Sequence, residues 1–236
     1  MNETEDSGRR LLSAVERLLV GDEELAREVE RALGRAGLER CRSEAEFARA
    51  ADAVIRGYAR RTMVSGGLTA LPALLPGVGT VATLTGGVLA DMAFTLKCET
   101  EMALALSHLH GFDVRQERER RAALLLASIA TYDAKTEGNF LADVAEAQGT
   151  AIWNYAPRQA SKLLLLVLSK LALLAAGKGL ARAVPLVGIA VGASLNRVLT
   201  ERVGERIRRE LQARRSRGEA DAEPGGEPVV DARVVR

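Results

Sequence analysis

The sequence predicts an all-α protein, a multi-helix globular bundle around a central helical hairpin that is striped with glycine and broken by proline. Hydrophobic residues make up 47% of the chain and aromatic residues only 3%, so the core must be built from Ala, Leu, Val and Gly. Ala and Leu favour helices, and small residues let helices approach closely. Apolar residues recur mostly at helical spacing, without convincing strand-like alternation.

Residues 1–42 are expected to form two short amphipathic helices. The first carries an apolar stripe from Leu11 to Leu19, and the second carries one from Leu25 to Leu33. Gly21 is expected to end the first helix, and Asp22 to cap the second. These helices would form an appendage to a larger helical domain.

Residues 43–212 are predicted to form that helical domain. It opens with Ser43-Glu-Ala-Glu46, which matches the capping box of a helix N-terminus. This helix is expected to end before Gly66 and Gly67. Its inward side chains would be Phe47, Ala50, Val54, Ile55 and Tyr58.

The central hairpin is predicted from a 29-residue stretch without charge, Thr62 to Ala90. Pro72 and Pro76 predict a break in the helix over this stretch, since proline removes a hydrogen bond and clashes with the preceding turn. We expect a short helix near Leu68–Leu75, a break at Pro-Gly-Val-Gly, and then a long helix to about Leu109.

The remaining helices follow from punctuation and periodicity. Gly111 is expected to stop the long helix, and Asp113 to cap the next one. A further helix is expected over about Phe140–Tyr155, after which Pro157 precedes a very apolar segment. Residues 213–236 combine proline, glycine and many charges, which predicts a disordered tail. The inward residues of the helix after Asp113 would be Leu125, Leu126 and Ile129.

An internal repeat suggests how two of these helices pack. Pro76-Gly-Val-Gly79 matches Pro185-Leu-Val-Gly188, and each is followed by small residues in steps of four, which keep to one helix face. Such stripes let helix backbones approach closely, so we expect the two helices to pack together; chance repetition in a Gly- and Ala-rich chain is the alternative. The two stripes are Gly79, Thr83, Gly87 and Asp91, and Gly188, Gly192, Asn196 and Thr200.

Asp91 interrupts the apolar run, and a buried carboxylate needs a partner. It is expected near the shared helix surface, close to Asn196 or Thr200. The cations that could pair with it are Lys178, Arg182 and Arg197. A structural ion pair or hydrogen bond is the simpler interpretation, and a proton- or ligand-sensitive switch is the alternative.

The stretch from Gly66 to Asp113 resembles the central part of the EcsC protein family. That family's pattern has a Gly-rich apolar segment that ends in Asp, then a helix, then an aliphatic or aromatic stretch that ends in Gly-x-Asp. In this sequence the pattern falls on Gly66, Gly67, Asp91, Gly111 and Asp113.

A second element of that family, Pro-x-x-Gly-x-x-x-Gly-x-x-x-Asn, resembles the segment from Pro185 to Asn196. The resemblance covers about Phe47 to Leu211 and leaves the N-terminal helices and the tail outside. It implies a mostly helical, membrane-associated protein without an established biochemical activity. An accessory role in a membrane or transport process is suggested by the resemblance alone.

The sequence offers no catalytic motif, metal site or cofactor site, so we expect a protein that is not an enzyme. The phosphate-binding loop, the dinucleotide fingerprint and the nucleophile elbow are all missing. His108 and His110 stand two apart on a helix and do not face each other. We expect both to flank a helix end, where the dipole favours a cationic ring.

Charge is concentrated in the second half of the chain. Ala156 to Arg217 holds 13 Lys and Arg against 3 Asp and Glu. A basic, apolar segment suits an anionic membrane surface or a membrane or protein partner. The segment lacks a nucleic-acid docking motif, so no nucleic acid is expected. The residues expected to contact the membrane surface or the partner are Lys162, Lys170, Lys178 and Arg182.

These observations predict a non-enzymatic protein in the cytoplasm, on the cytoplasmic face of a membrane. Two cysteines without a CxxC pattern, after a polar N-terminus, favour a reducing compartment and free thiols. The alternative is a soluble helical module that binds a protein partner or an apolar ligand. The sequence leaves open the oligomeric state and whether the hairpin inserts in a bilayer or is buried.

The predicted packing of the two stripes can be tested by replacing Gly87 with Leu. The larger side chain should push the two helices apart and disrupt the fold, because a Gly stripe works through close backbone approach. Thermal unfolding followed by circular dichroism measures the effect. A Gly87→Leu protein as stable as the parent would contradict the prediction.

Overall fold

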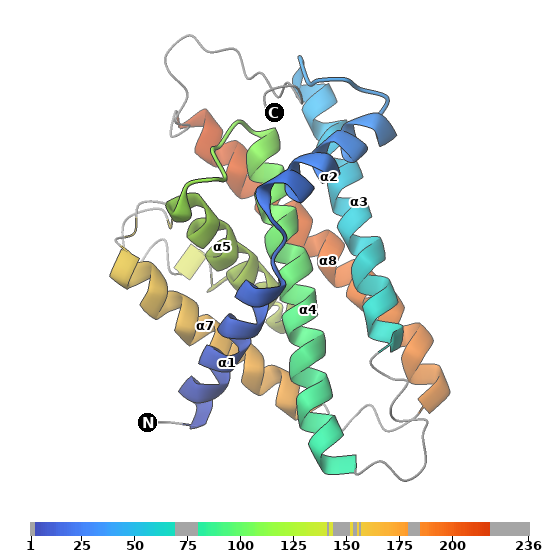
Figure 1. Cartoon of the computed structure of the whole chain (residues 1–236), viewed down its shortest axis with the longest axis vertical. Helices are drawn as coiled ribbons and strands as arrows, with labels where there is room; N and C mark the ends of the chain where they lie inside the picture. The colour runs from blue at the N-terminus through green and yellow to red at the C-terminus, as the bar shows by residue number, and fades with distance from the viewer. Residues whose placement is uncertain are drawn as a thin grey trace.

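The computed structural model describes residues 3–68, 80–140, 142–143, 152, 155, 157–178 and 185–217. Over these residues the protein is all-α, with seven helices and no strand, which confirms the predicted fold class (Figure 1). The helices are α1 (Glu3–Leu18), α2 (Asp22–Arg35), α3 (Glu44–Leu68), α4 (Thr80–Leu109), α5 (Glu117–Thr136), α7 (Pro157–Lys178) and α8 (Pro185–Ser216).

Helix α4 forms the centre of the bundle. It contacts each of the other six helices, and Figure 1 shows it running through the middle of the molecule. From Asp91 to Leu109 every side chain is buried or half-buried. This part of α4 has no face turned to water, so the other helices must pack around it on all sides.

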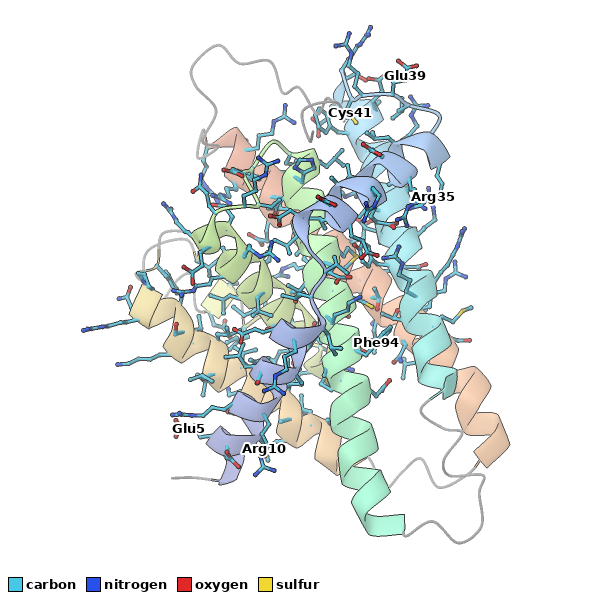
Figure 2. The ribbon with its side chains drawn as sticks, viewed as in Figure 1. Glu5, Arg10, Arg35, Glu39, Cys41 and Phe94 are labelled. Carbon is cyan, nitrogen blue, oxygen red and sulfur yellow. The ribbon has the colours of Figure 1, made fainter. Side chains whose placement is uncertain are left out.

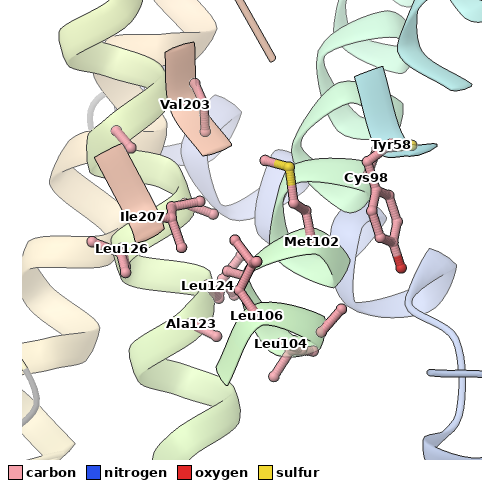
Figure 3. Close-up of a cluster of buried hydrophobic side chains, with 14 of the residues drawn as sticks. Tyr58, Cys98, Met102, Leu104, Leu106, Ala123, Leu124, Leu126, Val203 and Ile207 are labelled. Carbon is pink, nitrogen blue, oxygen red and sulfur yellow. The ribbon is translucent and has the colours of Figure 1, made fainter. Parts of the chain in front are cut away.

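The core is one continuous cluster of aliphatic side chains. Met102 and Leu106 of α4, Leu126 of α5 and Ile207 of α8 all belong to this cluster and are buried (Figure 3). Tyr58 of α3 lies on the other side of α4. The N-terminal helices contribute to the same cluster through Leu11, Val15, Leu25, Val29 and Leu33. The side chains of residues 1–42 therefore share one core with those of residues 43–212.

Helices α3 and α8 run antiparallel along one side of the bundle. Their hydrogen bonds join Thr62 to Thr200 at 3.0 Å, Arg208 to Asp52 at 3.3 Å, and Gln212 to Glu44 at 3.0 Å. The end of α3 and the start of α8 consequently lie at the same end of the molecule (Figure 1). The other end of α8 is fixed to α5 by the ion pair of Arg214 with Glu119.

The start of α3 has the predicted capping box. The Ser43 backbone N–H donates to Glu46 Oε2 at 3.1 Å, and the Glu46 N–H donates to Ser43 Oγ at 3.3 Å. The predicted end of this helix is wrong, because α3 continues through Gly66 and Gly67 to Leu68. Glycine in a helix costs only about 1 kcal/mol, and no proline occurs before Pro72 to force a stop.

Two predicted caps behave differently from expectation. Gly21 is the N-cap of α2, and Asp22 lies in the first turn, where its carboxylate pairs with Arg120. Asp113 Oδ1 accepts the Arg115 N–H at 3.1 Å, which closes a turn before α5, whose N-cap is Gln116.

The end of α4 and the start of α4 agree with prediction. Gly111 has a positive φ of 87°, a conformation that glycine adopts without strain, and the helix ends at Leu109. Helix α4 begins at Thr80, directly after Pro-Gly-Val-Gly. The predicted short helix near Leu68–Leu75 and most of that over Phe140–Tyr155 lie outside the described residues.

The C-terminal helix is longer than predicted. Helix α8 runs to Ser216, although the tail was expected to begin at residue 213. Arg214 explains the extension, because its guanidinium is buried against Glu119 and over the Phe112 ring, and so holds the last turn in place. The rest of the predicted tail, 218–236, lies outside the described residues.

None of the helices in the described part of the chain is both long enough and apolar enough to span a bilayer.

A glycine of α8 allows a close helix contact that a larger residue would block. A Cβ at Gly204 would lie 2.8 Å from Ile55 Cγ1 and 3.1 Å from Met102 Sδ. Gly204→Val should therefore lower the free energy of unfolding by about 2 kcal/mol or more, through overpacking. Urea unfolding measures the change.

Gly34 of α2 is the matched control, because a Cβ there would have nothing within 4 Å. Gly34→Val should change the stability by a few tenths of a kcal/mol, roughly the difference in helix propensity. Equal losses in the two variants would show that the contact at Gly204 does not limit stability.

Candidate functional site

The inside of the bundle holds a row of polar side chains on α4. Asp91, Thr95 and Glu99 follow one another in steps of four, and all three are buried. Steps of four place them near one face of the helix. Burying a polar group is costly unless it is hydrogen-bonded, so each member of this row needs partners.

Glu99 is the centre of the row and contacts two other helices. Thr131 Oγ1 of α5 lies 2.5 Å from Glu99 Oε2, and Thr200 Oγ1 of α8 lies 3.4 Å from Glu99 Oε1. Thr200 also bonds Thr62 of α3 at 3.0 Å. One carboxyl and three hydroxyls thus join α3, α4, α5 and α8 at the middle of the bundle. We refer to Glu99, Thr62, Thr131 and Thr200 as the Glu99 cluster.

The hydrogen-bond pattern suits a protonated Glu99. A threonine hydroxyl has one hydrogen to give, and Thr131 Oγ1 lies 2.7 Å from the backbone oxygen of Ala127. The single hydrogen of Thr131 is therefore shared between that oxygen and Glu99 Oε2, which limits how far this hydroxyl can stabilise a charged carboxylate. Thr62 has the same arrangement, with the backbone oxygen of Ala59 at 3.1 Å.

The electrostatics favour the same protonation state. Burial raises the pKa of Glu99 from 4.5 to about 7, because the charged form loses its hydration. The hydrogen bonds from Thr131 and Thr200 and the charge of Lys135 offset part of this increase in pKa. A carboxyl with a pKa near 7 exchanges its proton close to neutral pH.

The two predicted stripes lie on helices that do contact each other. Helices α4 and α8 meet at Glu99 and Thr200, and again at Met102 and Gly204. Asp91 and Asn196 are both buried. Gly79 lies outside the described residues, and for Thr83, Gly87, Gly188 and Gly192 the structure describes only the helical backbone, so the packing of these five positions stays a prediction.

The partner of Asp91 also stays a prediction. Arg197, one expected partner, is exposed and pairs with Glu201 at 2.9 Å. Thr200 bonds Thr62 and Glu99. The side chains of Lys178 and Arg182 lie outside the described residues.

Sequence reasoning missed the central residue of the Glu99 cluster, although a signal was present. Continuing the first stripe from Asp91 in steps of four gives Thr95 and then Glu99. Thr62 and Thr131 gave no signal of their own, because threonine is an ordinary residue in helices. Only the packing of four helices brings these hydroxyls to one carboxyl.

The predicted basic contact residues on α7 lie in different surroundings. Lys162 is exposed. Lys170 is half-buried, and its ammonium lies 5.3 Å from the centre of the Tyr132 ring and 4.9 Å from that of Phe140. Cation–π contacts of this kind hold a lysine against the protein surface.

An apolar surface with arginines beside it lies where α3 ends and α8 begins. Leu195 and Val198 of α8 and Met63 of α3 are exposed there. Arg60 and Arg202, each within about one helical turn of these residues, are also exposed, and neither has an ion pair with a described residue. We call these five residues the α3/α8 tip.

The expectation of a cationic histidine ring at the end of α4 is wrong. His110 is buried and stacks on Phe47 with ring centres 5.9 Å apart. Burial and the charges of Arg215 and Arg208 lower its pKa to about 4, so the ring is neutral. Burial outweighs the helix dipole here. The pKa of His108 is lowered as well, first by burial and then by Arg115.

The cysteines are free and buried in the core. Burial raises the pKa of Cys41 to about 11 and that of Cys98 to about 12, which keeps both as neutral thiols near neutral pH. Within the described ranges, no three His, Cys, Asp or Glu side chains are grouped so that they could hold a metal ion.

The fold and the Glu99 cluster define an all-helical protein whose central helix is buried on every side and carries a carboxyl among threonine hydroxyls. The family model of the EcsC protein family matches residues 14–215, and the chain belongs to that family. The match begins earlier than the resemblance seen in the sequence, since it includes the end of α1 and all of α2. No curated protein and no solved structure matches the chain.

The raised pKa of Glu99 predicts how stability depends on pH. Between pH 4.5 and about 7 the folded protein holds a proton that the unfolded chain has released, so the free energy of unfolding falls as pH rises. The contribution is fully present below 4.5 and is lost above about 7, a difference of about 3 kcal/mol.

Glu99→Gln removes this titration and keeps a similar shape. Its stability relative to the parent protein should therefore increase from pH 5 to pH 8, as measured by urea unfolding at both values. A relative stability that does not change over this range would show that Glu99 ionises inside the protein as easily as in water.

Proposed function

We propose that this protein is a non-enzymatic helical protein that docks reversibly on the cytoplasmic face of an anionic membrane through the α3/α8 tip. The observation behind the proposal is the composition of that tip. Apolar side chains stand at the end of two antiparallel helices, and arginines stand beside them. Exposed apolar patches rimmed by polar residues are typical of docking surfaces.

The arrangement of the tip fits a bilayer surface. Apolar side chains enter the boundary between headgroups and acyl chains, while cationic side chains remain level with the lipid phosphates. Met63, Leu195 and Val198 would supply the apolar contact, and Arg60 and Arg202 the charge. In the sequence, residues 69–79 follow α3 and residues 179–184 precede α8, and together they contain a single charged residue, Arg182.

The magnitudes favour reversible docking over permanent insertion. Full burial of a Leu, Val or Met side chain gives about 1.5–3 kcal/mol, and each basic residue near an anionic surface adds about 1 kcal/mol. Three partly exposed apolar side chains and two arginines therefore supply several kcal/mol. That amount supports a weak, salt-sensitive association and suits a chain in whose described part no helix could span a bilayer.

Basic residues outside the α3/α8 tip should also contribute to membrane binding, but to different extents. Arg182 lies in the stretch between α7 and α8, and Lys178 ends α7. Lys162 is exposed on α7 and adds charge. Lys170 contributes less, because its ammonium lies against two aromatic rings.

The non-enzymatic part of the proposal rests on the content of the Glu99 cluster. The cluster contains one carboxyl and three threonine hydroxyls, and each hydroxyl bonds the backbone, the carboxyl or another hydroxyl. A catalytic carboxyl or nucleophile has to contact its substrate. Glu99 and the three threonines are each 1% exposed or less, so a substrate would not reach them in this fold.

A second candidate function is a module that binds a helical segment of a protein partner. Leu166 and Leu173 are exposed and stand seven residues apart on α7, so they face the same direction. Apolar anchors with this spacing are typical of helix-to-helix binding. Docking through α7 would use a different surface from the α3/α8 tip, and substitutions can separate the two.

The proposal is tested by flotation of the protein with vesicles of phosphatidylcholine and phosphatidylserine. Replacing Leu195 and Val198 together with Asn should reduce the bound fraction by about tenfold or more, because two apolar side chains are lost from the contact. Arg202→Gln should reduce binding less, and its effect should shrink as salt is added.

Leu166→Asn is the matched control, because Leu166 and Leu195 are similarly exposed, at 49% and 53%. It should leave vesicle binding unchanged. Loss of binding with Leu166→Asn alone would move the docking surface to α7, and no vesicle binding by the parent protein would overturn the membrane proposal. Fractionation of native cells, with salt and carbonate washes, gives the corresponding result in the cell.

A further inference from the structure

Three arginines surround one buried carboxylate where α2 crosses α3. Glu28 of α2 is only 3% exposed, and it accepts from Arg31 at 2.7 Å and from Arg35 at 3.0 Å. Arg61 of α3 contacts the same carboxylate. Figure 2 shows Arg35 beside these two helices. We call Glu28, Arg31, Arg35 and Arg61 the Glu28 cluster.

We propose that the Glu28 cluster is a binding site for a phosphate group in its dianionic form. The charge supports this, because three guanidinium charges less one carboxylate charge leave +2. The carboxylate of Glu101 on α4 also interacts electrostatically with Arg61. Glu101 is paired with Lys97 at 3.0 Å, however, so these two charges cancel and the excess of +2 is unchanged. A phosphate dianion is the ligand whose charge matches the excess.

The geometry leaves donors available for such a ligand. Each guanidinium has five N–H donors, and the contacts with Glu28 use only part of them. The side chains of Arg31, Arg35 and Arg61 remain between 39% and 52% exposed, so their free N–H groups can reach solvent. Planar guanidinium groups bind phosphate through paired hydrogen bonds.

The cluster is held in position before any ligand arrives. Glu28 fixes one end of each guanidinium, and the guanidinium carbon of Arg61 lies 4.7 Å from the centre of the Tyr58 ring. Gly57 of α3 provides room, because a Cβ there would lie 3.0 Å from an Arg35 nitrogen. Fixed donors bind a ligand with less loss of side-chain entropy.

A comparison inside the same protein shows that neutralising a buried glutamate does not require three arginines. Glu119 is as buried as Glu28, and one arginine, Arg214, satisfies it with two hydrogen bonds of 2.6 and 2.7 Å. That pair is buried on both sides and serves the fold. The two additional arginines at Glu28 exceed what the carboxylate needs, which fits a site for an external anion.

The test measures binding of inorganic phosphate to the full chain at pH 7.5 by titration calorimetry, against potassium chloride of equal ionic strength. The parent protein should bind phosphate in a saturable manner. Arg31→Gln should weaken the affinity by about tenfold or more, as expected for one charge-assisted contact. Glu28 keeps Arg35 and Arg61 in this variant, so the carboxylate stays paired.

Arg56→Gln is the matched control. Arg56 is as exposed as Arg31, at 54% against 52%, and its partner Asp52 also pairs with Arg208, which pairs in turn with Glu205, so this group has no excess of arginine over carboxylate. Its phosphate affinity should equal that of the parent protein. Equal weakening in both variants, or no saturable binding by the parent protein, would overturn the proposed site.

A second measurement distinguishes the sources of the phosphate group. Vesicles that contain phosphatidic acid present a phosphate monoester in a headgroup, whereas inorganic phosphate is free. If Arg31→Gln weakens both, the site accepts either source; if it weakens only the binding of free phosphate, the ligand is a small molecule. The inference does not rest on the proposed membrane docking, since Leu195→Asn with Val198→Asn should leave the affinity for inorganic phosphate unchanged.

Discussion

The structure depends on the need to enclose α4. Its described side chains from Asp91 onward are buried or half-buried on all faces, so the helix has no stable place except the centre of a bundle. The other six helices all contact it, including the two N-terminal ones. The two N-terminal helices, which were predicted as an appendage, therefore belong to the core, because their apolar stripes cover surface that α4 would otherwise expose. With few aromatic side chains available, the enclosure relies on close approach of helices at small residues such as Gly204.

Within this apolar centre, polar groups are accommodated in two different ways. Glu119 forms an ion pair with Arg214 that is buried on both sides. Glu99 has threonine hydroxyls as neighbours, and burial favours its neutral form. The first arrangement ties the end of α8 to α5, and the second links four helices through hydrogen bonds around a carboxyl whose pKa lies near neutral pH. Both satisfy the rule that buried polar groups need partners, and both fix which faces of the helices meet.

Local features could be predicted from the sequence, and features made by distant segments could not. The capping box of Ser43 and Glu46 and the stop at Gly111 involve neighbouring residues, so pattern alone was sufficient. No sequence motif indicates that α3 continues past Gly66, because each glycine destabilises a helix by only about 1 kcal/mol. The lowered pKa of His110 depends first on its burial and then on Arg215 and Arg208, about one hundred residues away. Only part of the Glu99 cluster could be predicted. Its carboxyl continues the stripe from Asp91, and Thr200 belongs to the second stripe, whereas Thr62 and Thr131 gave no signal.

The antiparallel pairing of α3 with α8 has a consequence for how the chain is made. Glu44 of α3 pairs with Gln212 of α8, and Thr62 with Thr200. Helix α3 therefore gains these packing contacts only after α8, the last helix, has been made. During synthesis, α3 and α4 leave the ribosome well before the segment that covers them exists, at a rate of about 5–20 residues per second. For about 5–20 seconds the apolar surface of the nascent chain lacks its native partner. The newly made protein is therefore a natural client for chaperones that shield apolar helices, and a chain that ends before α8 would expose the interior of the bundle.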